Sequence, residues 1–176
     1  MKFKETTIKS RKIYKGRIVS LRDDIVILPN KVKAKREIVE HPGAVAVIAI
    51  TAKKEIVLVR QFRKPAEKAL LEIPAGLIKK GESGVAAARR ELKEETGFIA
   101  KSVKKIMEAY SSPGYSSEVI KYYIAKGLIR SKQDNEEDER IQVEILKMPD
   151  AIRRVKNGKI KDNKTIIGIY IARDSI

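Results

Sequence analysis

The hydrophobic residues of this chain change from a strand-like to a helical period at Ser83. Before this point, short alternating stretches rich in β-branched residues are separated by turn residues, which is typical of antiparallel strands. Residues 44–51 are apolar almost throughout and predict a central, buried strand. Residues 83–96 are mostly strong helix formers, with Ser83 as a suitable N-cap and Gly97 as a suitable C′ residue. The chain is therefore expected to combine strands and helices in an α+β fold.

Further strands are expected on both sides of this helix, and two further helices after it. The pattern predicts strands at 56–62, 70–75, 103–108, 119–125 and 142–146, a polar loop at 132–140, and helices at 149–157 and 163–173. The length suits one domain, or one domain with an appended N-terminal arm. We place the arm of antiparallel strands at residues 1–42 and the second domain at residues 43–176.

The chain carries a large positive charge, because Lys and Arg total 39 while Asp and Glu total 23, a net charge of +16. This predicts a polyanionic partner, either a nucleic acid or a phosphorylated small molecule. The lack of cysteine excludes thiolate metal sites, and a single histidine, His41, excludes multi-histidine metal clusters within one chain. The longest apolar run is too short to cross a bilayer and no signal core is present, so we expect a cytoplasmic protein without membrane contact.

Three glutamates gather on one side of the predicted helix. At 100° per residue, Glu91, Glu94 and Glu95 share an arc of about 100°. A core-facing stripe is formed by Val85, Ala88 and Leu92. Two cations, Arg89 and Lys93, lie on the far side of the helix. Carboxylates without Cys or His favour Mg²⁺ or Mn²⁺ over zinc, and a divalent cation would turn their repulsion into binding energy. The alternative is an ordinary solvated acidic face.

The spacing around these glutamates is more specific than the acidic face alone. It follows the pattern Gly-x5-Glu-x7-Arg-Glu-U-x-Glu-Glu-x-Gly-U, where U is a bulky apolar residue. Every position matches between Gly76 and Phe98. The chain therefore resembles the Nudix hydrolase family.

The resemblance implies a fold, a chemistry and roles for these residues. The fold is a loop–helix–loop site on an α/β/α sandwich around a mixed sheet, and the chemistry is Mg²⁺-dependent hydrolysis of a nucleoside diphosphate linked to another moiety. The metal ligands would be Glu91, Glu95 and the backbone carbonyl of Ala75, with Glu94 assisting catalysis. Glu82 and Arg90 would hold the loop against the helix, and Gly76 and Gly97 would be structural residues of the motif.

The general base of such relatives is a glutamate on a mobile loop late in the chain. Here an acidic run at 134–139 precedes a predicted strand, and the spacing back from that strand favours Glu137, with Glu139 second. A base on a closing loop would reach the water only with substrate in place. His41, beside Pro42 and Gly43, is expected to shape a turn instead.

Residues outside the motif resemble the ADP-ribose pyrophosphatase branch of the family. Pro113 follows Gly97 by 16 residues, a spacing typical of that branch, and stretches 36–43, 60–63 and 71–76 match it as well. The implied reaction is hydrolysis of ADP-ribose to AMP and ribose 5-phosphate. The closest competing substrate in the same fold is GDP-mannose or another nucleoside diphosphate sugar.

The same resemblance implies a substrate-binding set and a homodimer. Arg63 would contact the adenosine end of the substrate, and Arg36 would reach it from the partner subunit, because the N-terminal strands exchange between subunits. Arg17 stands where relatives often carry an aromatic residue that stacks on adenine, and an arginine can also stack on a base. Pro113 and Glu118 complete the set, Glu118 as a metal or substrate contact.

The charge alone suggests a different class of function, a basic RNA-binding module. Only nine residues are aromatic, which is few for a base-stacking platform, and the basic residues are dispersed along the chain. We therefore expect a small phosphorylated substrate rather than a nucleic acid.

Overall fold

The computed structural model describes residues 3–132 and 140–175 of the chain. The chain divides into two compact units. Unit 1 consists of Met1–Gly43 and Tyr110–Val119, and unit 2 consists of Ala44–Ala109 and Ile120–Ile176. No helix within the described ranges is both long enough and apolar enough to cross a membrane.

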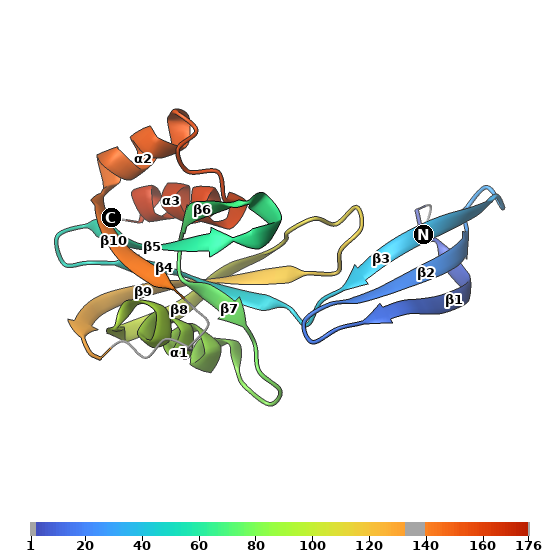
Figure 1. The fold of residues 1–176 in the computed structure, drawn as a ribbon, viewed down its shortest axis with the longest axis horizontal. Helices are drawn as coiled ribbons and strands as arrows, with labels where there is room; N and C mark the ends of the chain where they lie inside the picture. Colours follow the sequence, from blue (N-terminus) through green and yellow to red (C-terminus); the bar gives the residue numbers. More distant parts are fainter. Residues whose placement is uncertain (1–2, 133–139, 176) are drawn as a thin grey trace. The chain divides into compact units, whose positions relative to one another are not determined.

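Unit 1 is built on a three-stranded antiparallel sheet in the order β1-β2-β3 (Figure 1). The strands are β1 (Thr6–Lys15), β2 (Ser20–Ile27) and β3 (Lys33–Glu40). All ten residues of the edge strand β1 are exposed, whereas Asp24 and Val26 of the central strand are buried. The alternating, β-branched N-terminal residues thus form short antiparallel strands, as the sequence predicts.

Unit 2 contains a seven-stranded mixed sheet in the order β10-β5-β4-β9-β8, with β6 paired to β5 and β7 paired to β4. The central strand β4 runs parallel to β9 and antiparallel to β5 and β7. The strands that belong wholly or largely to this sheet are β4 (Ala44–Ile50), β5 (Glu55–Arg63), β6 (Lys68–Glu72), β7 (Ala75–Leu77), β8 (Phe98–Tyr110), β9 (Val119–Arg130) and β10 (Ile141–Lys147).

Helices cover both faces of this sheet. The helix α1 (Gly84–Thr96) lies on one face, and α2 (Met148–Lys156) and α3 (Asn163–Asp174) lie on the other (Figure 1). Alternate residues of β4 point to opposite faces, so one set packs towards α2 and α3 and the other towards α1. The residues that pack towards α2 and α3 are Ala46, Ile48 and Ile50. Those that pack towards α1 are Val45, Val47 and Ala49. This confirms the predicted α/β/α sandwich around a mixed sheet.

The ends of α1 follow the predicted capping chemistry. The Oγ of Ser83 accepts a hydrogen bond from the amide of Ala86 at 3.2 Å. Gly97 ends the helix with a φ of 67°, and its amide donates to the carbonyl of Lys93 at 2.9 Å. Glycine adopts this left-handed conformation without steric cost, which is why the helix stops here.

The apolar stripe predicted for α1 is wrong at one position. Val85 is 41% exposed, because it lies in the first turn beyond the edge of the core. The buried face of α1 contains Ala87, Ala88 and Leu92 together with two glutamates. The acidic arc and the core-facing stripe therefore overlap.

Other details of the strands also differ from the sequence predictions. The strand predicted at 70–75 is two strands, because the chain leaves β5 after Glu72, passes Pro74 and pairs with β4 from Ala75. Proline has no amide to donate to a ladder, so it falls at the break. Strand β8 starts directly after Gly97 rather than at Val103, and a short 3₁₀ helix, Lys64–Ala66, follows β5.

Candidate active site

The glutamates of α1 do not form a solvated acidic face. Glu91 is 9% exposed and Glu95 is 3% exposed, although both lie on a helix of a strongly charged chain. Carboxylates are rarely buried unless a partner or a ligand compensates for the lost hydration. The solvated alternative is therefore wrong for these two residues.

The backbone of β7 lies against both buried carboxylates. A Cβ atom built on Gly76 would lie well under 3.0 Å from the carboxylate of Glu91, so the absence of a side chain at Gly76 leaves the room that Glu91 occupies. The amide of the preceding residue, Ala75, donates to Glu95 Oε2 at 3.1 Å. Two carboxylates one helical turn apart thus rest on two successive residues of one strand.

Arg90 connects the loop before α1 to the acidic face of the helix. Its Nε and Nη2 atoms donate to the two carboxylate oxygens of Glu82, each at 2.9 Å. Its Nη1 donates to Glu91 at 2.6 Å and to Glu94 at 2.9 Å, and Nη2 also donates to the carbonyl of Leu77 at 2.9 Å. One guanidinium therefore contacts three carboxylates and the end of β7.

These contacts perturb the ionisation of both partners. The hydrogen bonds to Glu82, then those to Glu91 and Glu94, raise the pKa of Arg90 despite its partial burial. The bond from Arg90 likewise lowers the pKa of Glu82. The charge-assisted hydrogen bonds between Arg90 and Glu82 favour a fixed geometry of the loop against the helix.

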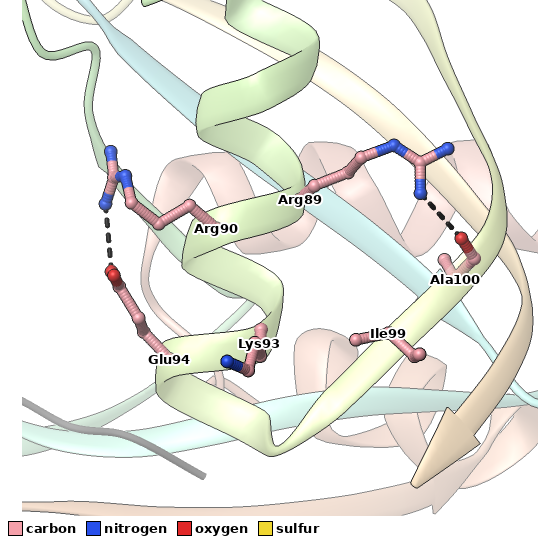
Figure 2. Close-up of a pocket in the computed structure, with 6 residues that line it drawn as sticks. All are labelled: Arg89, Arg90, Lys93, Glu94, Ile99 and Ala100. Carbon is pink, nitrogen blue, oxygen red and sulfur yellow. Dashed lines mark hydrogen bonds and ion pairs between the residues drawn. The ribbon is translucent and has the colours of Figure 1, made fainter. Parts of the chain in front are cut away.

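Arg89 and Arg90 are neighbours in sequence but serve opposite sides of the helix. Figure 2 shows Arg90 directed towards Glu94, whereas Arg89 extends towards the carbonyl of Ala100, to which it donates at 2.7 Å. The hollow drawn there is lined by Arg89, Arg90, Lys93, Glu94, Ile99 and Ala100, and includes neither Glu91 nor Glu95. The buried carboxylates thus lie outside this basic hollow.

The donor set at β7 and α1 fits a hard divalent cation. Its ligands would be oxygens from two buried carboxylates and a backbone carbonyl, and Mg²⁺ is usually bound by one or two carboxylates plus water or phosphate. Within residues 3–132 and 140–175, no three Asp, Glu, His or Cys side chains are grouped to hold a metal ion by themselves.

Arg63 lies in an ion-pair network that the sequence patterns did not reveal. At the end of β5, its Nε and Nη2 donate to Glu72 at 2.7 and 2.8 Å. Glu72 is almost completely buried and also accepts from Lys164 at the start of α3. One signal was visible in the sequence, since Glu72 is a lone carboxylate within the apolar run 70–73. Its partner Lys164, 92 residues away, carried none.

Two predicted substrate-binding arginines belong to unit 1. Arg17 is exposed in the turn between β1 and β2. Arg36 of β3 donates through Nε and Nη2 to Glu5, at 2.9 and 2.6 Å. This bidentate pair shows that the Arg36 fork can hold a carboxylate.

The other two predicted residues of unit 1 lie in or near the turn after β8. Pro113 follows Ser112, whose carbonyl accepts from the amides of Tyr115 and Ser116, so Pro113 belongs to a hydrogen-bonded turn. Glu118 Oε1 lies 3.6 Å from His41 Nδ1. Because that nitrogen also accepts from the amide of Gly43 at 3.1 Å, His41 is engaged within its own loop. The predicted bases, Glu137 and Glu139, lie outside the described residues.

The close packing of the Glu91 carboxylate against Gly76 allows a direct test of the site geometry. Gly76→Ala is expected to lower kcat by about 10²-fold, because the new methyl group displaces the Glu91 carboxylate, and displacements of about 1 Å have effects of that size. The melting temperature should change little, since Glu91 is a flexible side chain that can move. Steady-state kinetics and thermal unfolding measure the two quantities. Full activity of Gly76→Ala, or a double variant with Glu91→Gln that is much worse than Glu91→Gln alone, would contradict this geometry.

Comparison with known proteins gives two domain matches and several full-length relatives. A NUDIX domain model matches residues 40–166, and a model described as a nucleoside diphosphate sugar hydrolase N-terminal domain matches residues 5–39. A methanol dehydrogenase activator of Bacillus methanolicus is 47% identical over 95% of this chain and 91% of its own length. An ADP-ribose pyrophosphatase of Bacillus subtilis (strain 168) is 42% identical over 94% of this chain and 90% of its own length.

More distant matches agree with these. A GDP-mannose pyrophosphatase of Yersinia pestis is 38% identical over 74% of this chain and 70% of its own length. A solved structure described as an ADP compounds hydrolase superposes with a TM-score of 0.86 at 22% identity, covering 97% of this chain and 93% of that one. The likeness to that structure concerns the fold. From the domain match over most of its length and from its full-length relatives, the chain belongs to the Nudix hydrolase family.

Proposed function

We propose that this protein hydrolyses the pyrophosphate bond of ADP-ribose to give AMP and ribose 5-phosphate. The observation that carries the proposal is the pair of buried carboxylates, Glu91 and Glu95, on the backbone of Ala75 and Gly76. The Bacillus subtilis relative, named an ADP-ribose pyrophosphatase and similar over nearly the whole chain, supports this substrate.

The proposal includes a divalent metal, Mg²⁺ or alternatively Mn²⁺. Glu91, Glu95 and the carbonyl of Ala75 would hold it, and Glu94 would assist through its contact with Arg90. When bound, such a metal neutralises the diphosphate, lowers the pKa of a bound water and stabilises charge on the leaving phosphate. Arg90 holds Glu91 against the end of β7. Because the attacking group would be water, no covalent nucleophile from the protein is needed.

A general base and a set of substrate contacts complete the proposed site. Glu137 would accept the proton of the attacking water, with Glu139 as the second choice. Arg63 of unit 2 would contact the adenosine end of the substrate. The proposed contacts from unit 1 are Arg17, Arg36, Pro113 and Glu118.

We also propose that the protein acts as a homodimer in which the N-terminal strands contribute to the partner's site. The edge strand β1 is exposed at all ten positions, and an exposed edge offers unpaired backbone groups to a second chain. The match of residues 5–39 to a nucleoside diphosphate sugar hydrolase N-terminal domain supports a role of this segment in substrate contact. Light scattering after size exclusion should give twice the chain mass of 19.8 kDa, and a monomer would exclude the exchange.

A panel of nucleoside diphosphate derivatives tests the proposed reaction. With Mg²⁺ in ¹⁸O-labelled water, we expect ADP-ribose to give the highest kcat/KM, and the label to identify the phosphorus that is attacked. GDP-mannose is the alternative substrate that the Yersinia relative's name favours. A higher kcat/KM for GDP-mannose than for ADP-ribose would make GDP-mannose the proposed substrate instead. No hydrolysis of any compound in the panel would refute the proposed reaction.

A second candidate function is suggested by the Bacillus methanolicus relative, whose name describes a methanol dehydrogenase activator. If this chain has such an activity, adding it to a purified methanol dehydrogenase raises the rate of alcohol oxidation. The Glu91→Gln variant separates two routes to that effect. Activation lost in Glu91→Gln requires the hydrolytic site, and activation retained in Glu91→Gln requires only binding.

The RNA-binding alternative has a separate test. Charge-driven binding to RNA weakens steeply with salt, so a filter-binding titration at about 0.15 M salt should show weak association only. Tight, salt-resistant binding there would favour a nucleic-acid partner for the charge of +16.

A further inference from the structure

Glu72 is a buried carboxylate held between two cations. It is the last residue of β6, and its side chain is only 2% exposed. Both oxygens accept from Arg63, at 2.7 and 2.8 Å, and Oε2 also accepts from the ammonium group of Lys164. Burial alone would raise the pKa of Glu72, but the bond from Arg63 and the charge of Lys164 lower it below its usual value.

Lys164 is in an unfavourable place for helix stability. It lies in the first turn of α3, where the helix dipole repels a positive charge. Two carboxylates compensate for this, since Nζ also donates to Asp162 Oδ1 at 3.0 Å. Asp162 caps α3 by accepting from both the amide and the hydroxyl of Thr165. Lys164 thus connects the N-cap of α3 to the end of β6.

The segment that begins at Glu72 leads directly into β7, whose backbone lies against Glu91 and Glu95. The amide of Ile73 donates to Thr165 Oγ1 at 2.8 Å, and the carbonyl of Pro74 accepts from Val47 at 2.8 Å. The next residues are Ala75 and Gly76, which contact Glu95 and Glu91. Every residue from Glu72 to Gly76 is therefore held by a contact, and two of these contacts come from the start of α3.

Arg63 is the exposed member of this network. Its side chain is 39% exposed, against 13% for Lys164 and 2% for Glu72. The two bonds to Glu72 use the Nε–Nη2 edge of the guanidinium, which leaves the Nη1 side of a half-exposed group for a ligand. The hydrogen bond to Glu72 raises the pKa of Arg63, and the negative charges of Glu72, Glu95 and Asp162 add to this.

We propose that Lys164 is a positioning residue for substrate binding, because it holds the Glu72 carboxylate and through it orients the guanidinium of Arg63 towards the diphosphate of a nucleoside diphosphate substrate. This inference rests on the proposed function, since it assumes that Arg63 binds the substrate. It adds a role for Lys164 and Glu72, which lie away from the motif between Gly76 and Phe98. A rigid guanidinium loses less freedom when it binds a phosphate, so its orientation affects affinity more than the chemical step.

A double-mutant cycle between Lys164 and Arg63 tests this role. Lys164→Met is expected to raise KM for ADP-ribose about tenfold with kcat changed less than about threefold, the size of one charge-assisted hydrogen bond. In an Arg63→Ala background, Lys164→Met should change KM by less than about twofold, because the group it positions is gone. Equal effects in both backgrounds, or a fall in kcat with KM unchanged, would overturn the proposal.

Three further variants separate positioning from simple structural damage. Lys164→Arg keeps the positive charge and should return KM to within about threefold of the unsubstituted protein. Lys161→Met removes the charge of an exposed lysine nearby and should leave KM unchanged. If Lys164→Met does not fold, Glu72→Gln replaces it in the cycle with the same expected result. A Lys161→Met effect as large as that of Lys164→Met would overturn the proposal.

Calorimetric binding of ADP without metal distinguishes this proposal from the proposed reaction. If ADP-ribose is not hydrolysed but ADP binds about tenfold more weakly to Lys164→Met, the reaction is refuted and the positioning role stands. Hydrolysis of ADP-ribose with identical ADP binding by both proteins refutes the positioning role alone. If the unsubstituted protein neither hydrolyses ADP-ribose nor binds ADP, both proposals are refuted.

Discussion

Glu91→Gln and Glu95→Gln are each expected to lower kcat for ADP-ribose by about 10³-fold at saturating Mg²⁺. Glutamine keeps the shape and one acceptor oxygen of glutamate, so Ala75 and Arg90 retain a partner. It lacks the negative charge that a divalent cation requires. Steady-state kinetics with a Mg²⁺ titration measures the effect, and thermal unfolding should show a small change only, because removing one of two like charges at i and i+4 offsets the lost contact.

The matched control for these variants is Glu108→Gln. Glu108 is an exposed glutamate of β8 paired with Lys105, and the same substitution there should leave kcat unchanged. Undiminished turnover in both Glu91→Gln and Glu95→Gln would refute the assignment of these residues as metal ligands. An equal loss in Glu108→Gln would indicate a general effect of charge instead.

Arg90→Ala is expected to destabilise the protein by about 2 kcal/mol and to remove most of the activity. The substitution leaves Glu82, Glu91 and Glu94 without the cation that contacts all three, and uncompensated carboxylates in a partly buried site are costly. The estimate is at the low end for a broken ion pair because each group keeps some solvent contact. Urea unfolding measures the free energy, and kinetics with ADP-ribose measures the activity.

Arg89→Ala is the natural control, because Arg89 precedes Arg90 on the same helix and contacts only the carbonyl of Ala100 among the described hydrogen bonds. It should cost about 0.5–1 kcal/mol, the net value of one hydrogen bond. Arg90→Lys should lie between the two variants, since an ammonium group cannot span Glu82 and the α1 carboxylates together. Equal free energies of unfolding for Arg89→Ala and Arg90→Ala would contradict the role of Arg90 as the connecting residue.

Local features of the fold were predictable because local physics determines them. The helix that starts at Ser83 and ends at Gly97 follows from a capping hydroxyl, a run of helix formers and a glycine that can adopt a positive φ. The buried strand β4 follows from an apolar run that can face a core on both sides. The prediction that Val85 faces the core was wrong, because periodicity gives only the direction of a side chain. Its burial depends on whether a neighbouring segment reaches that turn.

The chemistry of the motif could also be predicted from the sequence alone. The order Gly76, Glu82, Arg90, Glu91, Glu95 places an arginine between carboxylates at helical spacing, and spacing within one loop and helix is a local property. The role of Gly76 was not readable, because its absent side chain matters only where β7 meets Glu91. The burial of Glu91 and Glu95 likewise depends on which strand the helix packs against.

The sequence by itself determined the elements, the family motif and the class of ligand chemistry, because capping, periodicity and residue spacing act over a few residues. Only the tertiary structure decided which carboxylates are buried, which backbone supports them and which cations hold Glu72. Arg63, Glu72 and Lys164 meet because β5, β6 and α3 pack together, and Glu72 and Lys164 are 92 residues apart in the chain. Contacts between distant segments depend on the packing of the whole sheet, so no pattern in a single sequence specifies them.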